Sequence, residues 1–218
     1  MFSRIFMTVS LLILLITITK VDSCEKGEDG HCMVNDGPMD DDIKKSDSLF
    51  NQKVDWEKAE NIYQFYATDI HGKNVSLDKY RGHVLIIINV ASECGLTEIN
   101  YKQLVELHEK YGKSKGLEIL AFPSNQFAGQ EPGTSQEIYK FATERFNVKF
   151  DIFEKINVNG PDAHPLWKWL KTQGKGFITD DIKWNFTKFI INKQGKVVSR
   201  SSPTAKPLDL EDELIKLF

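Results

Sequence analysis

The sequence predicts an α/β domain, a three-layer α/β/α sandwich with a mixed central sheet. Residues 84–91 and 117–122 are near-continuous apolar runs, which is the pattern of strands buried on both faces of a sheet. Helical patterns follow each run, and two strands joined by a short turn come near the C-terminus. Parallel strands linked by helices, followed by an antiparallel hairpin and a last helix, describe this architecture.

The first elements of the domain are predicted from alternation and turn residues. Residues 62–68 and 74–77 alternate in polarity on either side of the turn Asp69-Ile70-His71-Gly72, which predicts a two-stranded hairpin. Residues 84–91 then form the first buried strand, because their β-branched side chains suit a sheet that is covered on both sides.

Helical spacing alternates with the second buried strand in the middle of the domain. Apolar side chains recur every three or four positions over residues 97–111 and again over 134–146, which predicts two helices. The strand between them, 117–122, is expected to stop at Pro123 because proline has no N–H for a sheet.

The C-terminal part predicts a helix, a hairpin and a closing helix. Residues 163–172 place their large apolar side chains on one helical face. Residues 186–191 and 196–201 read as strands, joined by the turn Asn192-Lys193-Gln194-Gly195. Residues 208–217 close the chain as an amphipathic helix.

The N-terminal 53 residues differ in composition from the domain. Arg4 precedes an almost continuous apolar stretch at residues 5–19, and small residues before position 24 suit cleavage there. This predicts a signal peptide over residues 1–23 and a secreted, extracellular protein. The alternative is a membrane anchor, for which the stretch is short and carries four Thr or Ser residues. Residues 24–53 are polar and charged, and we expect a flexible arm.

Charge and cysteine content narrow the function classes. The formal net charge of −3 gives a nucleic-acid partner no electrostatic support. The His and Cys residues show no metal-ligand spacing, so we expect no metal. Three cysteines leave at least one thiol without an internal partner in an oxidising compartment. Cys24 and Cys32 are expected to pair with each other or with another chain, which isolates Cys94.

Cys94 stands between the first buried strand and the helix that is expected to begin at Thr97. A thiol there faces unpaired N–H groups and the positive end of the helix dipole, which favours the thiolate. Thr97 is the expected N-cap of that helix. A single Cys in an apolar setting is also typical of a buried structural residue. Position alone therefore leaves a catalytic and a structural interpretation open.

Three blocks of sequence resemble the signatures of the glutathione peroxidase family. They are residues 89–97 (NVASECGLT), residues 120–133, which contain LAFPSNQF and QEPG, and residues 183–189 (KWNFTKF). The resemblance covers residues 54–218 and is to the phospholipid hydroperoxide type, because the connection between the helix at 163–172 and the third block is short. It implies a thioredoxin-like fold and a monomer.

The resemblance implies roles for four residues. Cys94 matches the nucleophile, and Gln130, Trp184 and Asn185 match the catalytic Gln, Trp and Asn of the family. Amide and indole N–H groups donate hydrogen bonds to a thiolate without titrating. The implied reaction reduces hydrogen peroxide and organic or lipid hydroperoxides to water and alcohols, and leaves a sulfenic acid on the sulfur.

The implied reductant is glutathione or another thiol, with no bound cofactor. Lys183 and Arg200 match positions that line a glutathione site. Two features depart from relatives: residues 141–146 contain no resolving Cys, and Leu96 stands where mammalian relatives often have Lys. A lipid hydroperoxide substrate also implies transient contact with a membrane surface.

Two further functions stay open, as does the native identity of residue 94. A thioredoxin-like protein instead of glutathione would be the reductant if a resolving Cys were present. A secreted interaction protein without turnover would be indicated by the loss of any of the four implied catalytic residues, and all four are present. Some family members carry selenocysteine at the position of Cys94, and the sequence does not decide between the two.

Overall fold

The computed structural model describes residues 55–176 and 178–218. The predicted signal peptide and polar arm lie outside the described residues. No helix within the described part is both long enough and apolar enough to cross a membrane.

The centre of the domain is a mixed five-stranded sheet with the order β5-β4-β3-β6-β7. The strands β3, β4 and β5 are parallel to one another, whereas β6 pairs antiparallel with β3, and β7 pairs antiparallel with β6. The predicted mixed sheet is therefore confirmed. The bounds of the five strands are β3 Val84–Val90, β4 Leu117–Pro123, β5 Asp151–Ile152, β6 Lys188–Ile191 and β7 Val197–Ser201.

Two apolar clusters cover the two faces of the sheet, because successive side chains of a strand point to opposite sides. On β3, Ile86 and Ile88 belong to one cluster, and Leu85 and Ile87 belong to the other. All seven residues of β3 are buried. The predicted three layers are thus confirmed.

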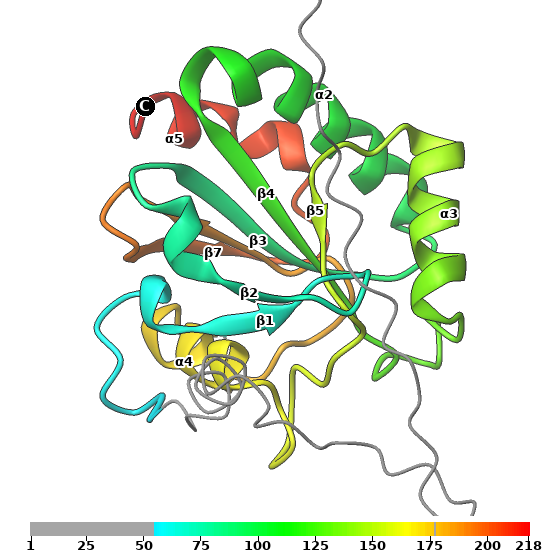
Figure 1. Ribbon diagram of the computed structural model, residues 1–218, viewed down its shortest axis with the longest axis horizontal. Helices are drawn as coiled ribbons and strands as arrows, with labels where there is room; N and C mark the ends of the chain where they lie inside the picture. Colours follow the sequence, from blue (N-terminus) through cyan, green and yellow to red (C-terminus); the bar gives the residue numbers. More distant parts are fainter. Residues whose placement is uncertain (1–54, 177) are drawn as a thin grey trace, which may run out of the picture. The chain divides into compact units, whose positions relative to one another are not determined.

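Figure 1 shows which elements cover each face. The helices α2, α3 and α5 lie on one side of the sheet, and α4 and the β1-β2 hairpin lie on the other. The bounds of these elements are β1 Tyr66–Thr68, β2 Asn74–Ser76, α2 Thr97–Lys115, α3 Ser135–Phe146, α4 Pro165–Gln173 and α5 Glu211–Ile215.

Three short 3-10 helices correct the predictions at both ends of the domain. Residues Ile62–Gln64 form η1 instead of the start of a strand. The side chain of Asn61 accepts the Tyr63 N–H, and the side chain of Gln64 accepts the Asn61 N–H, so the two close a capping box. The second, η2, is Leu77–Tyr80. At the C-terminus, η3 (Pro207–Leu210) takes up the first three residues of the predicted closing helix.

The middle of the domain differs from prediction at three points. Pro123 is the last residue of β4 and is not excluded from it, and its carbonyl oxygen accepts the Ile156 N–H at 2.9 Å. The helix α2 runs on to Lys115 and ends at Gly116, whose φ of +72° suits glycine. The strand β5 was not predicted, because it contains only two residues.

Candidate active site

Cys94 lies in the turn between β3 and α2. Its side chain is buried, with 8% of its surface exposed. The Thr97 hydroxyl donates to the Ala91 carbonyl oxygen at 2.7 Å and accepts the Cys94 N–H at 3.2 Å. The Thr97 N–H donates to the Cys94 carbonyl oxygen at 3.0 Å. Thr97 therefore holds the nucleophile turn closed on itself.

The predicted N-cap role of Thr97 is wrong. Thr97 is the first residue of α2, and Leu96 is the N-cap, without a side-chain cap. The hydroxyl of Thr97 points back to the turn because it is bonded to Ala91 and Cys94. The prediction that the helix begins at Thr97, directly after the nucleophile turn, is confirmed.

Gln130 lies in the loop between β4 and α3 and is tied to the nucleophile turn through its main chain. Its carbonyl oxygen accepts the N–H of Glu93, the residue before Cys94, at 3.0 Å. Its own N–H donates to the Phe127 carbonyl oxygen at 3.2 Å. The loop thereby brings Gln130 to the same edge of the sheet as Cys94.

Asn185 contacts Gln130 directly. The Asn185 Nδ2 donates to the Gln130 Oε1 at 2.9 Å. Because the Gln130 oxygen accepts this bond, the Gln130 amide presents its NH₂ group as a donor. Asn185 is fully buried. These two side chains, 55 positions apart in the sequence, thus form a pair.

Trp184 directly precedes Asn185 in the sequence and is 39% exposed. Its ring lies 5.9 Å from that of Phe127, centroid to centroid. The Asn89 side chain holds the Trp184 segment, since Asn89 Nδ2 donates to the Trp184 carbonyl oxygen at 3.1 Å. The Asn89 Oδ1 accepts the Thr187 N–H at 2.9 Å. The Asn89 carbonyl oxygen accepts the Phe186 N–H at 2.7 Å.

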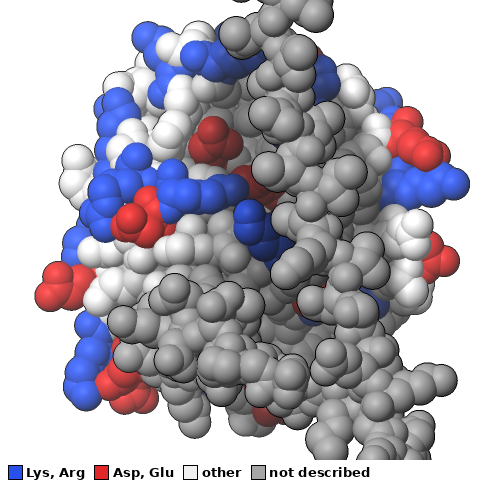
Figure 2. Space-filling view, in the orientation of Figure 1, with Lys and Arg blue, Asp and Glu red and all other residues white. Residues whose placement is uncertain are grey.

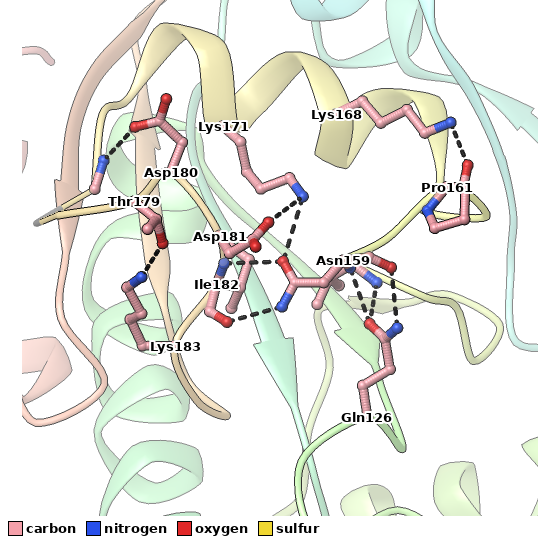
Figure 3. A network of polar contacts seen from close by, with 12 residues as sticks. Gln126, Asn159, Pro161, Lys168, Lys171, Thr179, Asp180, Asp181, Ile182 and Lys183 are labelled. Carbon is pink, nitrogen blue, oxygen red and sulfur yellow. Dashed lines mark hydrogen bonds and ion pairs between the residues drawn. The ribbon is translucent and has the colours of Figure 1, made fainter.

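A second polar network holds the chain at Ile182, two residues before Trp184 (Figure 3). Asn159 donates from Nδ2 to the Ile182 carbonyl oxygen at 2.8 Å and accepts the Ile182 N–H at 2.9 Å. Gln126 accepts the N–H groups of Val158 and Asn159, at 2.7 and 2.9 Å. Gln126 therefore belongs to this supporting network, and Gln130 belongs to the site.

Lys183 and Arg200 line one small cavity of about 200 Å³, together with Lys175. The Arg200 guanidinium donates to the carbonyl oxygens of Asp180 and Asp181, at 2.7 and 2.8 Å, and so holds this loop in place. The Lys183 ammonium contacts the neutral hydroxyl of Thr179. None of the lining residues that the structure describes is acidic. On the face drawn in Figure 2, by contrast, basic and acidic side chains lie interspersed.

Comparison with known proteins identifies the family. The family model described as Glutathione peroxidase matches residues 62–171. The phospholipid hydroperoxide glutathione peroxidase of Bos taurus is 57% identical over 162 residues, which are 73% of this chain and 81% of that protein. This chain belongs to the glutathione peroxidase family. The putative chloroplastic glutathione peroxidase 7 of Arabidopsis thaliana is 52% identical over 158 residues, 72% of this chain and 67% of that protein.

Solved structures agree with this family and with the predicted fold. The crystal structure of T. cruzi GPX1 has a TM-score of 0.61 and 41% identity, and covers 72% of this chain and 96% of that one. A thioredoxin family protein of Chlorobium tepidum, at 16% identity and a TM-score of 0.50, covers 70% of this chain and 92% of that one. The second likeness concerns the fold alone. The predicted thioredoxin-like fold is confirmed, and the enzyme class is that of a peroxidase.

Two residues of this glutathione peroxidase site were missed by sequence reasoning. Asn89 brackets the Trp184 segment, and its signal was a single polar residue inside the apolar run 84–91. Glu131 is fully buried beside Gln130, and nothing in the sequence distinguishes it from a solvated loop residue. Among the residues that the structure describes, no cluster of His, Cys, Asp and Glu is arranged to hold a metal ion.

Proposed function

We propose that this peroxidase reduces lipid and other organic hydroperoxides, as well as hydrogen peroxide, with Cys94 as the attacking residue. The carrying observation is the Asn185–Gln130 bond of 2.9 Å, on a Gln130 whose carbonyl oxygen accepts the Glu93 N–H at 3.0 Å. The main chain of Gln130 is thus bonded to the nucleophile turn, and its side chain is bonded to Asn185. The names of the mammalian relatives support the lipid substrate.

Gln130, Asn185 and Trp184 supply uncharged N–H donors to this site. Such donors stabilise the Cys94 thiolate and the developing alkoxide without exchanging their own protons. The sulfur attacks the distal peroxide oxygen, so that an S–O bond forms as the O–O bond breaks. The leaving alkoxide takes up one proton and departs as an alcohol, and Cys94 is left as a sulfenic acid.

Glutathione or a similar small thiol is the proposed reductant. A first thiol attacks the sulfenic sulfur, and a mixed disulfide and water form. A second thiol then releases the Cys94 thiolate, a disulfide and a proton. The cavity at Lys175, Lys183 and Arg200 supports a thiol that carries carboxylates, because ammonium and guanidinium groups pair with them. Since Arg200 is already bonded to main-chain carbonyls, Lys183 is the more available cation.

The proposed setting is outside the cell, with the enzyme acting as a monomer on peroxides at a lipid surface. Two exposed apolar side chains support the surface contact, Ile178 at 87% and Trp184 at 39% exposure. They are flanked in the sequence by Lys175 and Lys183, and such cations favour an anionic lipid surface. Secretion rests on the predicted signal peptide alone.

The test compares wild type with Cys94→Ser on a phospholipid hydroperoxide, with glutathione or thioredoxin as the reductant. We expect turnover with glutathione that falls by several orders of magnitude in Cys94→Ser, because a serine hydroxyl is a poor nucleophile at neutral pH. Lys183→Ala should raise the KM for glutathione and leave the rate of oxidation by peroxide unchanged. Substantial activity of Cys94→Ser would contradict the proposed nucleophile. Turnover with thioredoxin but not with glutathione would contradict the proposed reductant and would leave the proposed peroxidase activity unchanged.

A further inference from the structure

Glu131 is a buried carboxyl group that the mechanism above does not use. It follows Gln130 directly, and its exposed fraction is 0%. Neither carboxyl oxygen makes a hydrogen bond of good geometry with a described residue, but the Ser92 hydroxyl and N–H lie close enough to act on the carboxylate as donors. Its main chain, by contrast, is firmly held. The Glu131 N–H donates to the Asn125 Oδ1 at 2.8 Å, and its carbonyl oxygen accepts from the Lys155 ammonium at 3.0 Å. An ionised carboxylate in such a place is unfavourable.

Glu131 is among the residues that line a cavity of about 420 Å³ beside the nucleophile turn, although its carboxyl oxygens are themselves enclosed. Ser92 and Glu93, the two residues before Cys94, line the same cavity. The Ser92 hydroxyl is also buried, and it is a hydrogen-bonding neighbour of the Glu131 carboxyl. Since a water molecule occupies about 30 Å³ in the liquid, this volume is large enough for several. Water in the cavity therefore borders Ser92 and Glu93, next to Cys94, and Ser92 connects this water with the enclosed Glu131 carboxyl.

The charges around Glu131 keep its proton exchangeable near neutral pH. Burial raises the pKa of Glu131 to about 7, against the opposing effects of Ser92 and the Lys155 ammonium, and Glu93 acts in the same direction as burial. Lys155 does not neutralise the carboxylate by a direct bond, because its ammonium donates to the carbonyl oxygens of residues 131–133. Tyr101, whose buried hydroxyl lies near Glu131, stays protonated because burial raises its pKa.

We propose that Glu131 is the proton reservoir of this peroxidase, which supplies the proton taken up by the leaving alkoxide through the cavity at Ser92. This inference rests on the proposed function and adds a residue to it. A group whose pKa lies near the working pH exchanges protons most efficiently. Glu131 does not replace Gln130 or Asn185, which act as hydrogen-bond donors.

The proton returns within the catalytic cycle, so the reaction balances. In the oxidation step, the Cys94 thiolate, the hydroperoxide and protonated Glu131 give the sulfenic acid, the alcohol and ionised Glu131. The first reducing thiol forms the mixed disulfide and water, with no net proton change. The second thiol releases the Cys94 thiolate, the disulfide and one proton, and this proton restores Glu131.

The test is Glu131→Gln, with Glu137→Gln as its matched control. Gln keeps the shape of Glu131 and its capacity to donate hydrogen bonds, but it has no acidic proton. Glu137 lines the same cavity from an exposed position, and Gln can replace it in the capping box at Thr134. The readouts are the rate of Cys94 oxidation in rapid mixing, measured from pH 5 to pH 9, and infrared difference spectra.

We expect oxidation of Glu131→Gln to be about a hundred-fold slower at pH 6. The wild-type rate should decline above neutral pH as Glu131 loses its proton, and this decline should be absent from Glu131→Gln. Glu137→Gln should match wild type throughout. During oxidation by one equivalent of peroxide, time-resolved spectra of wild type should show a transient loss of the carbonyl stretch of a protonated carboxyl, and this change should be missing from Glu131→Gln.

Equal oxidation rates and equal pH profiles of wild type and Glu131→Gln would overturn the proposal, and so would a carboxyl band that peroxide leaves unchanged. The infrared measurement on wild type applies even where Glu131→Gln folds poorly. Failure of the proposed function is distinguishable, because Cys94→Ser would then reduce the hydroperoxide as fast as wild type does. If only the proposed role of Glu131 is wrong, peroxidase activity still depends on Cys94.

Discussion

Gln130 and Gln126 lie four positions apart in one loop, and their contacts give them different roles. The Gln130 carbonyl oxygen bonds to the nucleophile turn, and its side chain bonds to Asn185. The Gln126 side chain instead bonds to the main chain at Val158 and Asn159. Only one of the two amides therefore belongs to the proposed donor set.

Gln130→Ala should slow the oxidation of Cys94 by about a hundred-fold, because removing one aligned donor raises the barrier by about 3 kcal/mol. Gln126→Ala is the matched control in the same loop. It should lower stability by about 1–2 kcal/mol and change the oxidation rate little. Rapid-mixing oxidation rates and denaturant titrations measure the two effects. Equal slowing in both variants would contradict this division of roles.

Glu131 also makes the stability of the fold depend on pH. Its pKa is raised from 4.5 to about 7, so between these values the native state holds a proton that the unfolded chain has released. Native stability therefore falls as pH rises through this window, by up to about 3 kcal/mol, and changes no further above it. Glu131→Gln should lack this loss. Denaturant titrations of both proteins at pH 5 and pH 8 measure it, and parallel curves would contradict the shift.

At the scale of elements, the end of β3 organises the segment that carries Trp184 and Asn185. Asn89 is the one polar residue of this fully buried strand, and it bonds to Trp184, Phe186 and Thr187. Phe186 has a φ of +67°, which is unfavourable for an aromatic residue. The bonds of Asn89 on both sides of Phe186 stabilise this conformation.

Asn89→Ala should lower stability by about 2 kcal/mol, since it leaves the buried Thr187 N–H without its partner and removes one of two hydrogen bonds to the Trp184 carbonyl oxygen. It should also slow Cys94 oxidation at least ten-fold in the fully folded protein. Asn192→Ala is the control, because Asn192 also accepts two main-chain N–H bonds, but in the β6-β7 turn. That variant should lose about 1 kcal/mol and oxidise at the wild-type rate. If Asn89→Ala oxidised Cys94 at the wild-type rate, Asn89 would have no role in positioning the Trp184 segment.

The elements that the sequence predicted well are those whose pattern is set by burial. The strands at 84–90 and 117–123 are buried on both faces, so their apolar runs left little ambiguity. Residues 62–64 were predicted as the start of a strand because the polarity of residues 62–68 alternates. They form a 3-10 helix instead, which is capped by the Asn61 side chain. The strand β5 has two residues, and its pairing with β4 depends on tertiary contact that no local pattern carries.

At the scale of the whole molecule, the site forms where the sheet reverses direction. The C-terminal end of β3 meets the N-terminal end of β6, because Ile88 pairs with Lys188 in an antiparallel register. The four implied catalytic residues were found through three sequence blocks. Asn89 and Glu131 were not, because their roles depend on partners about 40 to 100 positions away that only the fold brings close.

Cysteine content predicts the route of regeneration. Cys94 is the one cysteine among the described residues. Because we expect Cys24 and Cys32 to be paired in an oxidising compartment, the first thiol to reach the Cys94 sulfenic acid should be external. A full-length Cys24→Ser/Cys32→Ser variant should turn over at the wild-type rate with glutathione. Mass spectrometry of peroxide-treated wild type in glutathione should show a mixed disulfide at Cys94. A dominant disulfide from Cys94 to Cys24 or Cys32 would make the N-terminal segment a resolving element.

The bond between Asn89 and Thr187 joins residues 98 positions apart, and this separation bears on the order of folding. Closing so long a loop is slow compared with forming a helix or a local hairpin. The strands β3 and β4 and the helix between them can associate first, because they are neighbours in the sequence. The nucleophile turn would then exist before Trp184 and Asn185 reach it. A nascent chain that has not yet added β6 therefore carries its thiol with only Gln130 of the three donors that control its reactivity.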